Sequence, residues 1–540
     1  MAPANPIAVN SDAQIQPAAA RRRDPRFVLT GGYARLPAAF YARLDPATVA
    51  APRLIRYNCG LAADLGLPVD GVDDADLAAV FSGNVLPEGA DPIAMAYAGH
   101  QFGGFVPQLG DGRAILLGEV TDRAGCRRDI QLKGSGRTPF SRNGDGLAAL
   151  GPVLREYLLS EFMHAIGIPA TRALAAVSTG ETVYRERALP GAILTRVAAS
   201  HVRVGTFQYF AARGDLDSVR RLADHVIDRH FPALPADPDD PRTEDGEFPA
   251  GRHLALLREV LERQARLIAK WMCVGFIHGV MNTDNMAVSG ETIDFGPCAF
   301  MDAYDPAKVF SSIDSMGRYA YSNQPRAAQW NLARFAETLL PLIDPLEARA
   351  IELATAELAR FPARFEAHWL SGMRRKLGLD TAEDGDADLV RGLLEAMHAG
   401  DADFTLTFRR LCDAAANANA NADEGAARGS GGAGADGVRA LFADAAAFDS
   451  WAAAWASRLS REPGAPAERA AAMRLENPAY IARNHRVEQA IEAAVERADF
   501  TVFGDLLAVL EHPFEESVGR QAYAQPPLPA ERVLQTFCGT

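Results

Sequence analysis

One short segment, residues 276–296, constrains what this chain can fold into more than any other. It contains Phe276-Ile-His-Gly-Val-Met-Asn-Thr-Asp-Asn285 and, a few residues later, Ile293-Asp-Phe-Gly296. The residues between them predict two short strands around a Ser289-Gly290 turn. Such a hairpin would bring Asn285 and Asp294 to one point, and their hard oxygen atoms suit a Mg²⁺ ion that bridges triphosphate oxygens. The segment therefore predicts a site for a metal-bound nucleotide, with Asp284 at its rim as a candidate base.

The order of these residues also has a known counterpart. A loop that opens with His278 and ends in Asn285, followed by a hairpin and Asp-Phe-Gly, is the layout of the metal-binding half of the protein kinase fold. However, the position two residues after the His, where a kinase loop has its catalytic Asp, is Val280. Valine cannot accept a proton. Either the chain is catalytically inactive, or Asp284 has taken over the role of base.

Composition limits the partners more than the domain organisation. The 540 residues, 48% of them hydrophobic, suffice for several average domains or for one large two-lobed enzyme. The net charge is −14, with 55 Lys and Arg against 69 Asp and Glu. This balance disfavours nucleic acid and anionic membranes as main partners. An anionic ligand would therefore need a local cluster of basic side chains.

Signals for export or membrane insertion are not found in the sequence. The first 26 residues are rich in Ala and Pro, include Arg21-Arg-Arg23 and contain no apolar run typical of a secretory signal, so we expect a flexible tail at 1–26. No stretch approaches the roughly 20 apolar residues of a membrane span. The six cysteines form no Cys-x-x-Cys pair. We expect a cytoplasmic protein without a thiolate metal site.

The chain before residue 113 predicts one helix and a glycine-rich loop. Residues 53–67 have helical apolar spacing that ends at Gly66, and the chain from there to Pro92 is expected to be loop. Five glycines then fall within residues 97–113. Glycine allows a backbone to approach a ligand closely, so this density favours a binding loop.

The next segments predict a lysine and a glutamate in the positions that kinase-like proteins use. Strands are expected at 113–120 and 129–133, with Lys133 on the same face as Gln131. A helix over 152–165 follows, and Glu156 lies off its apolar face. A strand lysine paired with a helical glutamate holds nucleotide phosphates in kinases. Taken singly, each residue is more often a solvated surface charge, but the order of the signals matches a two-lobed kinase.

The C-terminal part is expected to be mostly helical. A long helix is predicted over 253–274, and further helices over 329–340, 345–366 and 475–497. Residues 413–437 are a low-complexity run of Ala, Asn and Gly, which predicts an insertion loop.

Together these motifs resemble one family. They are Tyr97-Ala-Gly-His-Gln-Phe-Gly, Gln108-Leu-Gly-Asp-Gly-Arg-Ala114, Gln131-Leu-Lys-Gly-Ser-Gly-Arg-Thr-Pro139, Arg155-Glu-Tyr-Leu158, His278-Gly-Val-Met-Asn-Thr-Asp-Asn-Met286 and Ile293-Asp-Phe-Gly-Pro297. The chain resembles the selenoprotein O family, also called YdiU, which consists of pseudokinase-like enzymes that transfer AMP rather than phosphate to proteins. The resemblance extends from about Leu36 to the C-terminus.

The resemblance implies an α+β fold: a two-lobed, protein-kinase-like fold with an N-terminal extension and an enlarged, mostly helical C-lobe. We expect the extension and N-lobe at 27–200 and the C-lobe at 201–540. The implied activity is transfer of AMP from ATP to Ser, Thr or Tyr hydroxyls of proteins, with UTP as a further nucleotide substrate. Pyrophosphate would leave, and ATP would bind flipped relative to a kinase. Mg²⁺ or Mn²⁺ is the implied cofactor, and a monomer is expected.

By motif match, the resemblance also assigns residues. Lys133 and Glu156 would form the ion pair, Asp284 would be the base, and Asn285 and Asp294 the metal ligands. The residues implied for the nucleotide pocket are Gly110, Gly112, Arg113, Lys133, Asp145, Gly146, Arg196, Arg203 and Asp294. Charge supports the flipped pose, because attack at the α-phosphorus builds charge on pyrophosphate and calls for fixed cations. Without the resemblance, Arg196 and Arg203 would be expected at the surface.

Two cysteines complete the expectations. Cys298 directly follows Asp294-Phe-Gly-Pro297, and Cys538 is the third residue from the C-terminus. In the resembled family some members carry selenocysteine near the C-terminus, and the tail thiol can bridge to the loop after Asp-Phe-Gly. The resemblance thus implies a regulatory disulfide between Cys298 and Cys538, transient in a reducing cytoplasm.

Two alternatives remain open at the level of sequence. A small-molecule or protein phosphotransferase would explain His278, Asn285 and Asp294 but should carry Asp in place of Val280. An inactive nucleotide-binding scaffold would explain Val280 but leaves the other site residues without a task.

Overall fold

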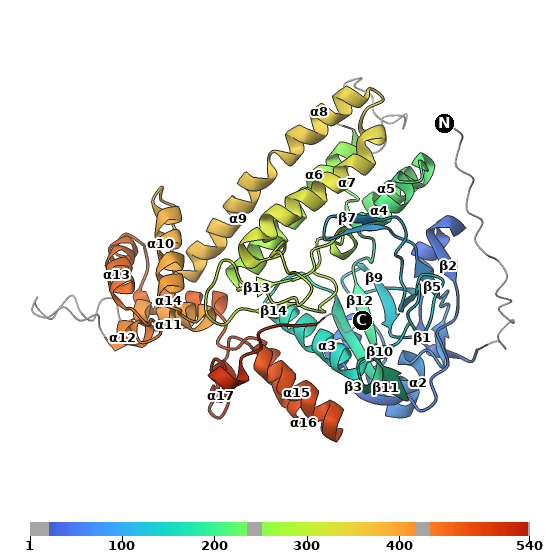
Figure 1. Cartoon of the computed structure of the whole chain (residues 1–540), viewed down its shortest axis with the longest axis horizontal. Helices are drawn as coiled ribbons and strands as arrows, with labels where there is room; N and C mark the ends of the chain where they lie inside the picture. Colours follow the sequence, from blue (N-terminus) through green and yellow to red (C-terminus); the bar gives the residue numbers. More distant parts are fainter. Residues whose placement is uncertain (1–20, 235–250, 417–432, 538–540) are drawn as a thin grey trace, which may run out of the picture.

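An antiparallel sheet organises the N-terminal half of the protein (Figure 1). The computed structural model describes residues 21–234, 251–416 and 433–537. The strands follow the order β2 (Tyr41–Arg43), β5 (Ile93–Met95), β8 (Ala114–Thr121), β9 (Arg127–Lys133), β12 (Ala188–Ala198), β11 (Arg172–Tyr184) and β3 (Arg53–Tyr57), and β10 (Ala148–Ala149) also pairs with β12. The predicted hairpin is confirmed, because β8 and β9 are antiparallel neighbours.

Helices cover both faces of this sheet, which explains why its strands are apolar on both sides. Ile130 and Leu132 of β9 pack into a cluster with helix α2 (Asp74–Phe81). On the opposite face, Leu194 of β12 belongs to the large core that contains helix α3 (Leu150–Ala165). The predicted helix over 152–165 is therefore confirmed. It is buried almost all round, since α15 (Asn484–Arg497) and α16 (Thr501–Leu510) pack against it as well.

Short strand pairs form separate small sheets outside the main sheet. They are β1 (Arg23–Val28) with β4 (Leu86–Glu88), β6 (Gly99–Gln101) with β7 (Gly104–Val106), and β13 (Phe276–Ile277) with β14 (Ala299–Phe300). The parallel pairing of β1 with β4 corrects the expected tail at 1–26, because residues 23–26 are strand; residues 1–20 lie outside the described part of the chain.

Two further N-terminal predictions were wrong. The segment 53–67 is not one helix: residues 53–57 form β3, and only α1 (Cys59–Asp64) is helical. Its first apolar residues serve the sheet, where Leu54 pairs with Val177, so tertiary packing overrides a short helical pattern. The expected loop before Pro92 contains α2, which Asp73 caps by accepting a hydrogen bond from the backbone of Asp76.

The remainder of the described chain is mainly helical, as predicted. Its helices are α4 (Val204–Ala211), α5 (Leu216–His230), α6 (Arg252–Cys273), α7 (Gln324–Ile343), α8 (Glu347–Leu358), α9 (Phe361–Lys376), α10 (Asp386–Ala399), α11 (Phe404–Ala416), α12 (Ala433–Arg439), α13 (Ala446–Leu459), α14 (Pro466–Glu476), α15 (Asn484–Arg497), α16 (Thr501–Leu510) and α17 (Gln521–Ala524). Helices α6, α7, α8 and α9 pack side by side, with α6 against each of the other three (Figure 1). None of the helices in the described ranges is long and apolar enough to cross a membrane.

Prolines explain where the predicted C-terminal helices break. The segment 345–366 is divided between α8 and α9, and Pro362 occupies the first turn of α9, a position that tolerates proline. The run over 475–497 is also interrupted, because α14 ends at Glu476 just before Pro478. The expected insertion loop at 413–437 begins and ends in helix, within α11 and α12, and residues 417–432 lie outside the described residues.

Candidate active site

A cavity of about 770 Å³ opens between the glycine-rich segment, the end of β9 and the segment 280–297. Several of the residues expected to bind nucleotide or metal line it: Gly110, Gly112, Arg113, Lys133, Asp145, Gly146, Asp284, Asn285 and Asp294. They come from segments far apart in the sequence, so the fold brings them together. The volume falls within the range typical of small-molecule sites.

A network of charges forms one wall of the cavity. The Lys133 Nζ lies 2.6 Å from a Glu156 carboxylate oxygen and 2.9 Å from Asp294 Oδ1. Strand pairing explains part of this geometry, because Arg196 on β12 lies opposite Gln131 on β9 and shares a face with Lys133. Helix α3 covers that face and supplies Glu156. This residue is buried because it lies on the side of α3 that contacts Lys133 and Arg196 of the sheet.

Arg196 and Arg203 lie behind Asp294. Arg196 Nη2 is 2.7 Å from Asp294 Oδ1, and Arg203 Nη1 is 3.2 Å from Asp294 Oδ2. The two arginines are only 1% and 3% exposed, so the alternative of surface solvation is wrong. Neither is among the residues that line the cavity, so their contact with a nucleotide stays a prediction.

These cations determine the ionisation of Asp294. Burial by itself would raise the pKa of the Asp294 carboxyl, but Lys133, Arg196 and Arg203 outweigh that effect and hold the pKa well below its usual range. Asp294 also has a left-handed backbone with φ of +64°, which is uncommon for a residue with a side chain. The carboxylate is therefore kept charged and held in one orientation.

Asp284 has the opposite electrostatic environment. It sits in a short 3₁₀ turn, η3 (Thr283–Asn285), and is 7% exposed. Among the residues that the structure describes, Oδ1 has no hydrogen-bond partner, and Oδ2 accepts a long hydrogen bond of 3.4 Å from Gln101 Nε2. Burial raises the pKa of this carboxyl to about 6. A Cβ on Gly99 would lie 2.4 Å from Asp284 Oδ1, so glycine is required there for the close approach of the chain.

Asn285 and Asp294 offer oxygen atoms to the same cavity, but not through a hairpin. The predicted strands over 286–293 are absent: Ala287 pairs with Arg203, and Thr292 pairs with Ala170. Only the turn is confirmed, where Gly290 has φ of +80°. The reason is that each side of the turn finds a partner elsewhere in the fold.

The donor set suits a hard cation. Asn285 Nδ2 donates to the Val280 carbonyl at 3.0 Å, which leaves its amide oxygen to accept or to coordinate. Within the described ranges, no group of three or more His, Cys, Asp or Glu side chains could hold a metal. A metal here would thus depend on Asn285 and Asp294 together with nucleotide oxygens, the arrangement that Mg²⁺ commonly takes.

Three contributors were missed by sequence reasoning. The first is Tyr97, whose ring centroid lies 4.6 Å from the guanidinium carbon of Arg203. Gln101 is the donor to Asp284, and Arg185 pairs with Asp145 at 2.7 Å on the cavity wall. The motif around residue 97 could have indicated the first two, whereas Arg185 carries no signal in the sequence.

The segment after Asp-Phe-Gly is held from two sides. Arg155 on α3 donates to the Gly296 carbonyl at 3.1 Å and to the Cys298 carbonyl, and Cys298 is fully buried. From the other side, the Thr536 hydroxyl donates to the Pro297 carbonyl, and the Thr536 backbone pairs with Ser311. The C-terminal segment therefore reaches the loop that carries Cys298, although Cys538 itself lies outside the described residues.

Comparison with known proteins gives a family for this chain. A family model described as "Protein adenylyltransferase SelO" matches residues 28–511. The chain is 61% identical over 514 residues to a "Protein nucleotidyltransferase YdiU" of Rhizobium meliloti (strain 1021), covering 95% of this chain and 99% of that protein. It is 60% identical over 514 residues to a protein of the same name from Bradyrhizobium sp. (strain ORS 278), with the same coverage of both chains. The chain therefore belongs to the SelO family, as its motifs indicated.

Proposed function

We propose that this protein is a nucleotidyltransferase that transfers AMP from ATP to Ser, Thr or Tyr hydroxyls of other proteins and releases pyrophosphate. The family model and the names of the relatives support nucleotidyl transfer. The observation that carries the proposal is the contrast between two neighbouring carboxylates. Asp294 is held ionised by three cations, while the pKa of Asp284 is raised to about 6 by burial. Environments that separate two pKa values in this way assign different tasks to the two groups.

Asp284 suits the task of general base. A base works best when its pKa lies near the working pH, and a carboxyl with a pKa of about 6 is closer to neutrality than an ordinary aspartate. Asp284 lines the cavity, and its Oδ1 has no hydrogen-bond partner in the described part of the chain, which suits this oxygen to accept the proton of an acceptor hydroxyl. The deprotonated oxygen then attacks the α-phosphorus, and the bond to pyrophosphate breaks.

The leaving pyrophosphate needs positive charge. Arg113 and Lys133 line the cavity and would contact phosphate oxygens, as a flipped ATP requires. Arg196 and Arg203 act one step further away, because they keep Asp294 charged and oriented. Asp294 and Asn285 would hold Mg²⁺ or Mn²⁺, which neutralises phosphate charge when bound.

The overall arrangement supports a two-lobed, kinase-like fold. The antiparallel sheet with α3 would be the N-lobe, the helical remainder the C-lobe, and ATP would lie between them. We propose that the protein is a cytoplasmic monomer and that UTP is an additional substrate. We also propose that a disulfide between Cys298 and Cys538 regulates the site, since Thr536 is docked beside Pro297.

The products of nucleotide turnover distinguish the proposal from its alternatives. The protein is incubated with ATP, Mg²⁺ or Mn²⁺ and an acceptor protein, and the released small molecules are separated by ion-exchange chromatography. Release of pyrophosphate supports AMP transfer. Release of ADP would show a phosphotransferase, and neither product would show an inactive scaffold. Asp294→Ala is the control, because it removes the proposed metal ligand.

A further inference from the structure

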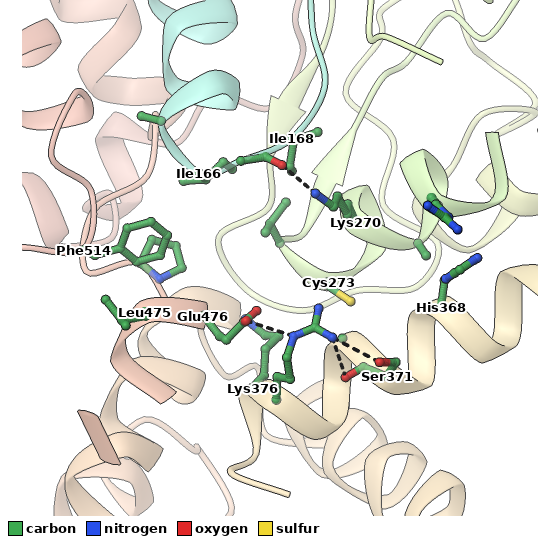
Figure 2. Close-up of a pocket in the computed structure, with 18 residues that line it drawn as sticks. Ile166, Ile168, Lys270, Cys273, His368, Ser371, Lys376, Leu475, Glu476 and Phe514 are labelled. Atoms are coloured by element: carbon green, nitrogen blue, oxygen red, sulfur yellow. Dashed lines mark hydrogen bonds and ion pairs between the residues drawn. The ribbon is translucent and has the colours of Figure 1, made fainter. Parts of the chain in front are cut away.

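A second cavity, of about 570 Å³, lies where the end of α3 meets α6, α9 and α14 (Figure 2). None of the residues that line it lines the candidate active site. Its size falls within the range of small-molecule sites. Neither the charge network nor the proposed transfer reaction uses it.

The floor of this cavity contains a buried cation. Lys376, at the end of α9, is 3% exposed. Its Nζ lies 4.2 Å from the centroid of the Phe408 ring and 5.8 Å from that of Phe404. The Lys376 backbone carbonyl accepts a hydrogen bond from Asn477 Nδ2 at 2.9 Å, but among the described residues its Nζ has no hydrogen-bond or ion-pair partner, although an ammonium group has three donors. Cation–π contacts offset part of the desolvation cost but leave those donors unmet.

The rim adds positive charge and little negative charge. The charged lining residues are Arg266, Lys270, Arg375, Lys376 and Glu476, together with His368. Glu476 is already paired with Arg375 at 2.9 Å. Lys270 donates to the Gly167 carbonyl at 2.6 Å but has no carboxylate partner in the described chain. Arg266 and His368 are paired with Glu262 at 2.9 and 2.7 Å, so the excess positive charge of this cavity comes from Lys270 and Lys376.

Apolar side chains complete the wall. Ile166 and Ile168 follow α3, Val274 follows α6, and Leu475 and Phe514 close the opposite side. Figure 2 shows Lys270, Cys273, Lys376 and Phe514 around one hollow. A ligand that fits must therefore combine a negative group with an apolar body.

We propose that this cavity is a second ligand site, which binds a small organic anion through Lys376 and Lys270 and packs its apolar body against Ile168 and Phe514. The anionic group is a phosphate monoester or a carboxylate, since both accept hydrogen bonds from ammonium donors. Burial lowers the pKa of Lys376 to about 8, and a bound anion would offset that cost. Such a ligand would supply the acceptors that the fold itself does not give to Lys376.

Thermal unfolding of the full chain with increasing phenyl phosphate or benzoate tests the proposal. We expect a saturable rise in Tm with at least one of them. Comparison of phenyl phosphate with benzoate shows whether the site binds a phosphate or a carboxylate. Benzyl alcohol lacks the charge and inorganic phosphate lacks the apolar body, so both should bind more weakly. Loss of one charge-assisted contact should weaken binding about 10- to 100-fold in Lys376→Met and in Lys270→Met.

Two matched variants locate the bound anion. Lys133→Met removes the corresponding charge from the candidate active site, and Lys308→Met removes a lysine that also lies over a ring, 5.0 Å from the Phe310 centroid. Both should bind phenyl phosphate as the unaltered protein does. If Lys376→Met does not fold, the weaker binding expected of Lys270→Met tests the proposal. The proposal is overturned if no probe raises Tm at concentrations up to about 10 mM, or if Lys133→Met alone abolishes binding.

Discussion

Replacing Asp284 by Asn should make the protein more stable and far less active. Burial raises the pKa of the Asp284 carboxyl from its ordinary 3.8 to about 6, so the charged form is disfavoured in the folded state. Each pKa unit corresponds to about 1.36 kcal/mol, which gives about 3 kcal/mol for ionised Asp284 above pH 6. Asn has nearly the same shape and no charge. The free energy of unfolding at pH 7 should therefore rise by about 3 kcal/mol.

The pH dependence gives the sign of this effect. Because the folded state binds the Asp284 proton more tightly than the unfolded state, the destabilisation develops as pH rises from about 4 to 6 and is complete above 6. The increase in the free energy of unfolding caused by Asp284→Asn should thus reach its full size at pH 7 and vanish near pH 4. Urea unfolding monitored by circular dichroism at several pH values, with a chelator present, measures it.

A second Asp-to-Asn change on the same cavity is the matched control. The pKa of Asp145 is lowered, chiefly by its hydrogen bond with Arg185, and the Asp145 side chain is 41% exposed. Asp145→Asn should therefore destabilise the protein, by at most about 1 kcal/mol because solvent screens the pair. Turnover of Asp284→Asn should fall about 10²- to 10⁴-fold, the usual contribution of a general base. The reasoning is refuted if Asp284→Asn is no more stable than the unaltered protein at pH 7.

Four further outcomes are expected. The turnover number of the unaltered protein should rise with pH through an apparent pKa near 6, and a flat profile from pH 5 to 8 would exclude Asp284 as the titrating base. Asp294→Ala should abolish AMP transfer at saturating ATP through loss of the metal, which metal titration of the variant by calorimetry can check. Arg196→Met should lower the free energy of unfolding by about 3–5 kcal/mol, because Glu156 and Asp294 lose a buried partner; a change below about 1 kcal/mol would contradict this. Oxidation should join Cys298 to Cys538 and lower activity, with Cys538→Ala resistant, and peptide mapping without reductant would reveal the linked pair or its absence.

Apolar spacing in the sequence correctly predicted those helices and strands whose formation depends on residues close together in the chain. The β8–β9 hairpin, α3 and α6 follow from alternating or helical apolar spacing, and each was predicted close to its observed bounds. The pairing of Lys133 with Glu156 was predicted from the kinase-like order of strand and helix and from the family resemblance, and the structure confirms it. These features depend on segments that are near one another in the chain.

Long-range packing accounts for what the sequence did not predict. Arg196 looks like a surface residue in its own segment, and only the sheet register and the cover of α3 bury it beside Asp294. The strands expected around Gly290 are missing because Ala287 and Thr292 pair with distant segments. The raised pKa of Asp284 is likewise a property of burial, which no local pattern contains.

The most direct test of the proposed chemistry follows the two ends of ATP. The protein is incubated with a mixed acceptor-protein sample, Mn²⁺ or Mg²⁺, and ATP labelled at either the α- or the γ-phosphorus, and labelled protein is detected after denaturing electrophoresis. We predict that label from the α-phosphorus enters protein, that label from the γ-phosphorus does not, and that Asp284→Ala and Asp294→Ala lower the signal. Incorporation of γ-label, or α-label that persists unchanged in Asp294→Ala, would contradict AMP transfer at this site.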